Sequence, residues 1–579
     1  MARRVTFDPG VIRTFLRLVT IMAAGFVYVL GSWTDWMTGR SSVARRAKRL
    51  RRIFERLGPT FIKLGQQMSV RADVLPYEFC TELSEMLDSA PPFPVQQAIR
   101  IVEERTRQPL SSVFARFEEE PIGSASLSCV YKAQRHGGAW VAVKVRRPGI
   151  GEKLAADLRA FGWVLQVAEW LTLLRPGLTR TLRIELGSML LEELDFHREA
   201  RNAELFVQNA REDRLDFVRA PEIHFDLSTD DVLVMELVSG VFLKDLLAAL
   251  DRNDVAEIAR IRAQGVDPRV VAHRLVLAAH WELLEAVLFH ADPHPANILI
   301  QPGNQLVFID FGSCGRIGGK TRRIWRQFYY DFAEKNVMGM VERAIDILEP
   351  IPPVDVDALS KEIEGMFWDW VHAMKSEHSE WWEKAGGIMW MRFAGMTRRY
   401  GVPMTPDVLR IFRATFLYDT SLFRLYLGLH QSDEFSKYHH QAGKRARRRI
   451  HRAIAKRLDG GLTKDDYVRL EDLARMGRQI VTRVQHFLDI PQVNFAHVIS
   501  KVAFTATLFL RLATWGIAAY VVWVIAQVSY DAARGTSHGL QDLVLDAVHW
   551  NQRTAVVAAI VVWILVRRLL MRIQDIELR

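Results

Sequence analysis

The sequence predicts an α+β fold of two lobes, the first rich in strands and the second helical. Two observations carry this prediction. Residues 111–240 contain short strand-like stretches around glycine turns, whereas helical periodicity dominates residues 244–429. Strands followed by helices is the order of an α+β protein. With 579 residues, of which 49% are hydrophobic and 25% charged, the chain is able to bury such lobes.

The chain divides into six segments by composition. They are an N-terminal segment at 1–35, a helical extension at 36–110, a strand-rich lobe at 111–243, a helical lobe at 244–435, a basic connector at 436–498 and an apolar region at 499–579. In the first segment, arginines precede an apolar run at 18–31 that is too short to predict a span. This pattern favours an amphipathic helix on a membrane surface, and a helix packed on the folded domain is the alternative.

Local patterns place the elements of the extension and the first lobe. The extension holds a basic stretch at 45–56, a helical pattern that ends at Pro91-Pro92, and a second helix over 95–105. CVYKAQRHGGAWVAVKV predicts two strands around a Gly-Gly turn. A long helical stretch follows and breaks at Pro176, after which DVLVMELVSG predicts a buried strand.

Two apolar stretches near the C-terminus, 502–527 and 554–566, predict a transmembrane hairpin. The first is interrupted only by Arg511, and the second runs into Arg567 and Arg568, which would lie among the headgroups. Two buried core helices are the alternative. The loop at 529–552 carries one fixed cation, Arg534, and the tail carries four, so the folded domain and the C-terminus are expected on the cytoplasmic side.

The net charge of +10 suits an anionic partner, which is a nucleic acid, a nucleotide or a membrane face. The basic run at 444–457 favours a juxtamembrane patch that faces acidic lipid, with a solvated helix face as the alternative. It lacks interleaved aromatic residues, so no nucleic acid is expected as a partner. Cys80, Cys129 and Cys314 form no metal-ligand or disulfide pattern, which fits a reducing compartment.

Four polar residues follow one another in the order of a nucleotide site: Lys144, Asp292, Asn297 and Asp310. Lys144 lies in VAVKV, which matches the kinase strand that presents a lysine to the α- and β-phosphates. In HADPHPAN, Asp292 and Asn297 stand as a catalytic aspartate and a magnesium-binding asparagine do. Asp310 opens DFG after an apolar strand, where a carboxylate chelates the metal. The sequence therefore predicts a kinase-type site for ATP and Mg²⁺.

The sequence also departs from ordinary kinases. Where a G-x-G-x-x-G-x-V loop is expected, the chain reads GSASLSCV, in which Ala125 and Ser128 replace two glycines. A Cβ at these positions restricts the approach of the backbone, so the loop is expected to bind phosphates with a different geometry. After DFG there is no A-P-E and little room for an activation loop, so a peptide substrate would lose its usual platform.

These motifs resemble those of a known family. KLGQ at 63–66, PIGSASLSCV, ELDFHREARN, ADPHPAN and DFG are similar, in this order, to the signature set of the UbiB-like (ADCK-like) atypical kinases, over residues 45–429. The resemblance implies a two-lobed protein-kinase-like fold with the KLGQ motif on the helical extension and with ATP and Mg²⁺ as cofactors. Two C-terminal spans are typical of its bacterial members.

The resemblance also implies roles for single residues. Lys63 and Gln66 are expected to reach over the site and block a peptide substrate. Glu193 and Asp195 are expected to contact Lys63 or magnesium.

Glu199 is expected to pair with Lys144, because a buried lysine needs a counter-charge, and Glu192 is left open as an alternative partner. The expected nucleotide-binding residues are Gly123, Ser124, Ala125, Ser126, Leu127, Ser128, Cys129, Val130, Lys144, Glu236 and Leu237.

The family likeness implies an ATPase-type kinase that supports ubiquinone (coenzyme Q) biosynthesis by acting on lipid intermediates or their enzyme complex. Expected partners are membrane lipids and quinone-biosynthesis intermediates and enzymes, and a homodimer is left open. The expected location is a bacterial inner membrane. Two alternatives remain: a kinase of small molecules, lipids or proteins, and a non-catalytic scaffold switched by nucleotide.

Overall fold

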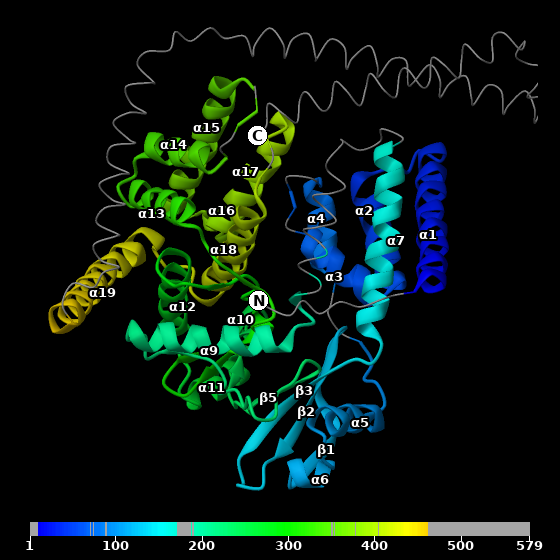
Figure 1. The fold of residues 1–579 in the computed structure, drawn as a ribbon. Helices are drawn as coiled ribbons and strands as arrows, with labels where there is room; N and C mark the ends of the chain where they lie inside the picture. Colours follow the sequence, from blue (N-terminus) through cyan, green and yellow to red (C-terminus); the bar gives the residue numbers. More distant parts are fainter. Residues whose placement is uncertain are drawn as a thin grey trace, which may run out of the picture. The chain divides into compact units, whose positions relative to one another are not determined.

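We analysed a computed structural model of the chain, shown in Figure 1. It describes residues 10–69, 71–72, 75–86, 90–170, 187, 190, 192–348, 351–352, 354–376, 378–402 and 404–460. The chain divides into two compact units, of which the first comprises Met1–Glu349 and Asp355–Ile450. The predicted hairpin at 502–527 and 554–566, the connector beyond residue 460 and the break at Pro176 lie outside the described residues.

The described chain begins with the helices α1 (Val11–Met37), α2 (Val43–Leu57), α3 (Pro59–Met68) and α4 (Tyr77–Ser84). Ile21, Ile53, Phe61 and Leu64 form a buried apolar cluster that joins α1, α2 and α3 to the later helix α7 (Ile150–Trp170). Figure 1 shows these helices side by side. The extension is therefore a packed helical layer.

Helix α1 is longer than the apolar run at 18–31, which by itself is too short to predict a span. The helix continues through polar residues whose side chains are bonded within it or to its neighbours. Thr14 donates to Gly10 O at 2.8 Å, Thr20 donates to Leu16 O at 2.9 Å, and Asp35 pairs with Arg49 at 2.6 Å. By length and composition, α1 is the one helix among the described residues that could cross a bilayer.

The strand-rich lobe is a four-stranded antiparallel sheet in the order β1-β2-β3-β5. Its strands are β1 (Arg116–Ser124), β2 (Ser128–Gln134), β3 (Trp140–Arg146) and β5 (Val232–Glu236). The predicted hairpin is confirmed, because β2 and β3 pair from Ser128↔Arg146 to Gln134↔Trp140. Helices α5 (Val95–Thr106) and α6 (Leu110–Val113) cover the sheet through a core that includes Ala98, Val102 and Val113.

Helix α9 (Phe196–Glu212) packs on the other side of this sheet, where Phe196 and Ala200 meet Ala142 and Leu233. The chain then forms a second four-stranded sheet in the order β4-β9-β8-β6. Its strands are β4 (Val218–Arg219), β6 (Val241–Phe242), β8 (Ile298–Gln301) and β9 (Gln305–Phe308), and a separate pair is formed by β7 (Phe289–His290) and β10 (Cys314–Gly315). The short 3-10 helix η1 (Pro295–Asn297) leads into β8.

Helices make up the rest of the second lobe, as the periodicity predicts. They are α10 (Leu243–Asp251), α11 (Val255–Ala263), α12 (Pro268–Leu284), α13 (Gly319–Ala333), α14 (Val337–Leu348), α15 (Val356–Lys375), α16 (Trp381–Lys384), α17 (Gly386–Tyr400), α18 (Pro406–Leu425) and α19 (Gln431–Gly460). Buried aromatic residues join several of them. The ring centroids of Trp325 and Trp390 lie 4.9 Å apart, and those of Trp390 and Phe412 lie 4.6 Å apart.

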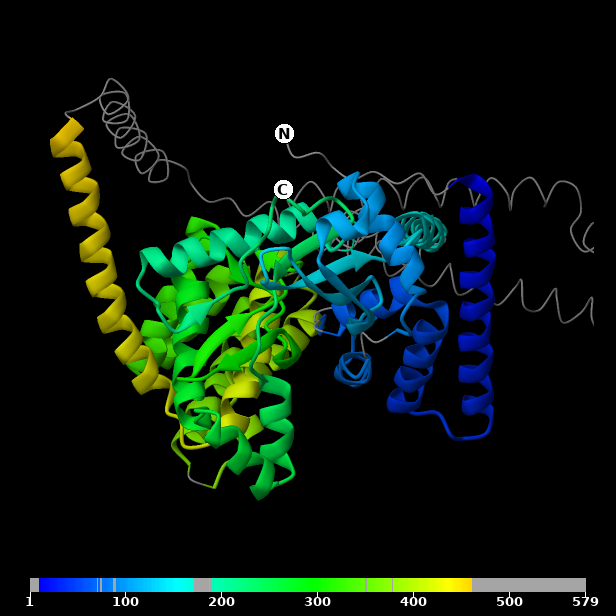
Figure 2. The ribbon, with the colours of Figure 1, turned by 90° about the horizontal axis from the view of Figure 1, so that it is seen from below.

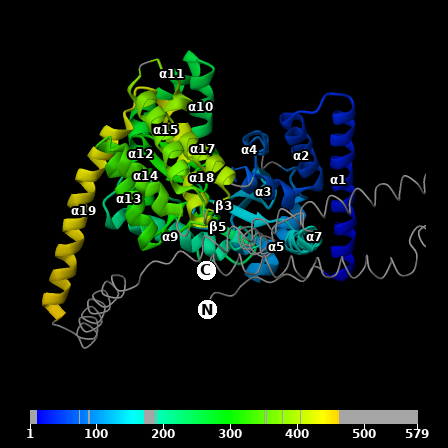
Figure 3. The ribbon, with the colours of Figure 1, turned by 90° about the horizontal axis from the view of Figure 1, so that it is seen from above.

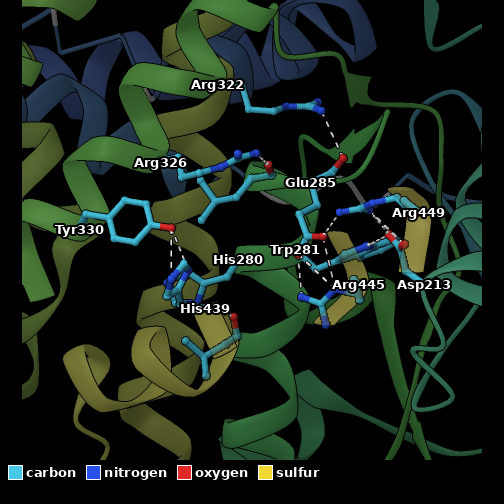
Figure 4. A network of polar contacts seen from close by, with 12 residues as sticks. Asp213, His280, Trp281, Glu285, Arg322, Arg326, Tyr330, His439, Arg445 and Arg449 are labelled. Carbon is cyan, nitrogen blue, oxygen red and sulfur yellow. Dashed lines mark hydrogen bonds and ion pairs between the residues drawn. The ribbon is translucent and has the colours of Figure 1, made fainter. Parts of the chain in front are cut away.

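Helix α19 carries the basic run, and part of that run faces inward. Arg445 pairs with Glu285 at 2.6 Å, and Arg449 pairs with both Glu285 at 2.5 Å and Asp213 at 3.0 Å. Figure 4 shows these groups together with Trp281, whose ring N–H donates to Asp213 at 2.9 Å. Two cations of the run thus hold α19 against α12 and the end of α9, which is not what a patch directed wholly at lipid requires.

Candidate functional site

Lys144 is held at the centre of the first sheet, because β3 pairs with β2 on one side and β5 on the other. Its ammonium group donates to Glu199 Oε1 at 2.7 Å and to Oε2 at 3.0 Å. The lysine side chain is 14% exposed and the glutamate 4%. Burial alone would lower the pKa of Lys144, but the carboxylates of Asp310 and Glu199 outweigh it and hold its pKa above the ordinary value.

Glu199 stands in the first turn of α9, and Asp195 accepts the backbone N–H of Arg198 at 2.9 Å as the cap of that helix. This capping bond fixes where α9 begins and therefore where Glu199 lies. Glu192, the alternative partner for Lys144, pairs with Arg198 at 2.7 Å instead. The structure thus joins Lys144 to Glu199 and uses Asp195 as a helix cap.

Asp310 lies just beyond β9, with Oδ2 at 3.7 Å from the ammonium of Lys144 and Oδ1 accepting the Gly312 N–H at 2.9 Å. Burial would raise the pKa of Asp310, but Lys144, the Gly312 N–H and Lys63 lower it to about 2. The carboxylate is therefore charged at neutral pH.

Asn297 donates its amide to Asp292 O at 3.3 Å, which leaves its side-chain oxygen as an acceptor. No three His, Cys, Asp or Glu residues within the described ranges gather into a metal cage. A charged carboxylate and an amide oxygen fit Mg²⁺, because this ion binds few protein oxygens and completes its shell with water and phosphate. Asn297 and Asp310 are the residues that would hold it.

Asp292 is held from two sides. Its Oδ1 pairs with Arg413 of α18 at 2.9 Å, and its backbone N–H donates to His290 Nδ1 at 3.2 Å. The second bond requires an unprotonated Nδ1, so the proton of the neutral ring lies on Nε2. Burial lowers the pKa of His290, which keeps the ring neutral at pH 7.

Behind His290 lies a buried carboxyl group. Glu282 Oε2 accepts the backbone N–H of His290 at 2.8 Å, and its Oε1 accepts the hydroxyl of Tyr418 at 2.7 Å. Helix α18 thus supports the Asp292 segment twice, once through Arg413 and once through Tyr418. Sequence reasoning missed Arg413, because no local motif marks an arginine so far along the chain from Asp292.

Lys144, Asp292, Asn297 and Asp310 line one cavity of about 250 Å³. Apolar side chains also line it, and the sequence did not mark three of them: Met235, Val238 and Phe196. A cavity lined by both apolar and charged side chains is what a nucleotide needs, because its base prefers apolar contacts and its phosphates prefer cations. The four residues that the sequence singled out are therefore brought together.

The loop at 123–130, which has few glycines, is bound to neighbouring elements. Leu127 is buried in a cluster with Ile150, Leu154, Leu190 and Leu194. Arg147 donates to Ala125 O at 2.8 Å, and its backbone N–H donates to Leu127 O at 2.9 Å.

The expected nucleotide-binding residues fall into two groups. Those that line the cavity are Ala125, Leu127, Ser128, Val130, Lys144, Glu236 and Leu237, and those that do not are Gly123, Ser124, Ser126 and Cys129. Ser126 and Cys129 are fully buried, and Ser124 donates to Ala90 O at 2.7 Å. The carboxylate of Glu236 is bound by Arg219, and the N–H of Leu237 donates to Trp140 O at 3.2 Å.

The helical extension contributes one residue to the cavity. Lys63 of α3 pairs with Glu193 at 3.2 Å, and both line the pocket. Gln66 faces away and donates to Met86 O at 3.0 Å, whereas the next residue, Gln67, accepts from Arg413 at 3.0 Å. The link from α3 to Asp292 therefore runs through Gln67 and Arg413. Gln66, which was expected to reach over the site together with Lys63, is not among the residues that line the cavity.

The chain is similar to several known proteins. The model of the ABC1 atypical kinase-like domain matches residues 85–344. ACTIVITY OF BC1 COMPLEX KINASE 8, a chloroplastic protein of Arabidopsis thaliana, is 36% identical over 341 residues, which are 57% of this chain and 42% of that protein. An uncharacterized Synechocystis protein is 31% identical over 353 residues, which are 60% of each chain.

A solved structure from Mycobacterium tuberculosis, the complex of Rv3197 with erythromycin, aligns at 22% identity with a TM-score of 0.45 and covers 62% of this chain and 87% of its own. The chain spans between 42% and 63% of the length of the curated relatives it matches.

Proposed function

Because residues 85–344 match the model of the ABC1 atypical kinase-like domain, we propose that the chain is a membrane-bound atypical kinase or ATPase that uses Mg-ATP. We place its work in ubiquinone biosynthesis, on lipid intermediates or on the enzymes that handle them. The ubiquinone role and the bacterial inner membrane come from the family likeness and from the apolar stretches near the C-terminus. The kinase chemistry comes from the pocket.

The observation that carries the proposal is the convergence of Lys144, Glu199 and Asp310 within hydrogen-bond or ion-pair distance at one end of the cavity. Lys144 would bind the α- and β-phosphates, and Glu199 keeps its ammonium group charged and aimed. Asn297 and Asp310 would hold Mg²⁺, which when bound neutralises the charge that develops on the phosphates. The apolar part of the cavity lining would contact the base.

Asp292 would orient the acceptor. Arg413 binds its Oδ1, so Oδ2 remains to accept a hydrogen bond or a proton from an attacking hydroxyl group or water. The ion pair holds this carboxylate in one orientation, which favours the positioning of a nucleophile.

The Lys63–Glu193 pair brings the extension to the edge of the cavity, which supports water or a small acceptor over a peptide. A kinase of small molecules or lipids is the second candidate on the same ground.

Turnover of ATP by the purified full chain tests the proposal. We expect Asp310→Asn and Lys144→Ala to lower turnover by roughly 10²–10³-fold, because each removes a charge aimed at the phosphates. Magnesium-dependent thermal stabilisation by ATP should disappear in Lys144→Ala. Full activity in Asp310→Asn would contradict the proposal.

Labelled phosphate separates the candidates. Release as inorganic phosphate supports the ATPase, and transfer to extracted lipid supports the lipid kinase. Nucleotide binding without turnover, with and without anionic lipid, would instead indicate a scaffold switched by nucleotide.

A further inference from the structure

One surface of the described structure is strongly apolar and is covered by no described element. Helix α1 packs on α2 and α7 with one side only, and Figures 2 and 3 show it at the edge of the described elements. Its other side carries large apolar residues, each between 52% and 78% exposed: Ile12, Phe15, Val19, Met22, Phe26, Val29, Trp33 and Trp36. We call this set the α1 outer face. An apolar surface of this extent marks a contact that the described residues do not satisfy.

The inner side of α1 is tied to the folded unit near both ends. Arg17 pairs with Asp157 of α7, which is fully buried, and it also donates to Leu57 O at 2.9 Å. Asp35 pairs with Arg49 of α2 at 2.6 Å, and Arg49 also donates to Ser32 at 3.2 Å. These ties are about 27 Å apart along the helix, nearly the thickness of a bilayer core.

The ties exclude a span in the docked arrangement. Helix α2 runs beside α1 and presents a row of exposed cations at helical spacing: Arg45, Lys48, Arg52 and Arg56. A spanning α1 would draw this row into hydrocarbon, where each cation is costly. Detaching α1 would break the buried Arg17–Asp157 pair instead.

The cation row of α2, which comprises Arg45, Lys48, Arg52 and Arg56, also indicates what the α1 outer face contacts. Arg45 and Arg49 both reach Asp35, so the cation row borders the side of α2 that contacts α1. An apolar ridge next to a row of cations matches a bilayer surface with acidic headgroups.

The width of the apolar side argues against a second helix as its partner. At helical spacing, Leu16 and Val27 widen the apolar surface on one flank of the α1 outer face, and Val11, Leu30 and Met37 lie within it. A two-helix seam is narrower and is flanked by charged positions.

We propose that α1 lies in the plane of an anionic membrane, with the α1 outer face among the acyl chains and the cation row of α2 on the headgroups. This attachment is separate from the pocket and from the apolar stretches near the C-terminus. It holds the unit that contains the pocket against the lipid surface. Its test is therefore independent of the proposed ATP chemistry.

Depth measurements on the full chain test the proposal. Phe15→Cys, Met22→Cys and Phe26→Cys each carry a fluorescent label in vesicles of phosphatidylcholine and phosphatidylglycerol, with quenchers at known depths on the lipids. The native cysteines are buried, and labelling of the unsubstituted chain measures their background. We expect equal, shallow quenching at the three positions. Ala256→Cys, exposed on α11, serves as the control without quenching.

The role of the cation row is tested by comparing substitutions in it with matched substitutions on other elements. Changing Arg45, Lys48, Arg52 and Arg56 to Gln should weaken the dependence on phosphatidylglycerol by up to about fivefold per cation. The same change at Arg201, Arg211, Arg252 and Arg262, which are exposed on other elements, should leave it unchanged.

Three outcomes would overturn the proposal. Quenching that deepens from Phe15 to Phe26 would mean that α1 spans the bilayer. Energy transfer between labels without quenching by lipid would mean that a second copy covers the α1 outer face. Absence of both signals would mean that the surface meets no membrane.

Discussion

Glu199 is the residue on which the charge balance of the pocket depends. It accepts two hydrogen bonds from Lys144 in a position where neither side chain is more than 14% exposed. Removing one partner of such a pair leaves a buried charge without compensation, which costs more than the pair contributes.

We therefore expect Glu199→Ala to lower the free energy of unfolding by about 3–5 kcal/mol and to abolish stabilisation by ATP. Urea unfolding and thermal shift measure the two effects. Glu192→Ala is the control, because Glu192 pairs with Arg198 at a more exposed position and should change the stability by no more than about 1 kcal/mol. Equal losses in both variants would contradict the assignment.

Glu282 predicts a pH dependence. Burial raises the pKa of this carboxyl to about 8, although the His290 N–H and Tyr418 hydroxyl oppose the rise. The folded state therefore keeps a proton that the unfolded chain has lost above pH 4.5. Stability from this group is complete below that pH and falls as the pH rises toward 8.

The expected slope is at most about 1.4 kcal/mol per pH unit in this window. Because other groups titrate too, the measured quantity is the difference between the wild type and Glu282→Gln in urea unfolding from pH 5 to pH 9. The Gln variant cannot ionise, so its free energy of unfolding should increase relative to that of the wild type as the pH rises. If the difference in stability between the two proteins does not change with pH, Glu282 does not titrate between pH 5 and pH 9.

At the scale of elements, α3 depends on a glycine within the KLGQ motif. A Cβ on Gly65 would run into Met86 and Phe54, so this residue allows α3 to pack closely on its neighbours. Gly365 lies within α15 with no atom near its Cβ position. The two glycines thus have opposite requirements.

Gly65→Ala should lower the free energy of unfolding by about 1–3 kcal/mol, because the added methyl group would overpack the core around α3. Gly365→Ala should stabilise it by up to about 1 kcal/mol, since alanine restricts the unfolded chain and favours the helix. Urea unfolding of both variants provides the test. A gain in both would show that α3 is able to shift without cost.

Elements with a local signal could be predicted from the sequence, and long-range pairings could not. The β2–β3 hairpin and β5 were predictable, because strand alternation and the Gly-Gly turn are local patterns. The order of Lys144, Asp292, Asn297 and Asp310 also predicted that they share a pocket. The extent of α1 was not predictable from its apolar run, since Asp35, near the end of the helix, finds a partner in Arg49 of α2 that only the folded chain supplies.

The same reason applies to Gln66 and Arg413. A motif indicates that a side chain matters, but it does not say which way the side chain points. Gln66 turns to Met86, and the neighbouring Gln67 meets Arg413 of α18. Such pairings depend on how distant helices pack, for which the sequence contains no local pattern.

At the scale of the molecule, the polar network in Figure 4 joins segments far apart in the chain. Glu285 follows α12 and binds Arg445 and Arg449 of α19, while Arg322 of α13 donates to Glu285 O at 3.2 Å. Arg445 is buried, so it has no water to replace its carboxylate.

Glu285→Ala should therefore lower the free energy of unfolding by about 3–5 kcal/mol and release α19. Trypsin should then cleave sooner after Arg447 and Arg448. Glu257→Ala, which breaks an exposed pair with Arg260, is the control and should change neither property. Unchanged cleavage in Glu285→Ala would show that α19 is held by other contacts.

The burial of Leu127 has a consequence for access to the pocket. Lifting the loop would pull this side chain out of its cluster with Ile150 and Leu154, at a cost of about 1.5–3 kcal/mol. A lowered loop is therefore favoured over a raised one by about 10- to 150-fold. The proposed nucleotide would enter and leave beneath a loop that is seldom raised.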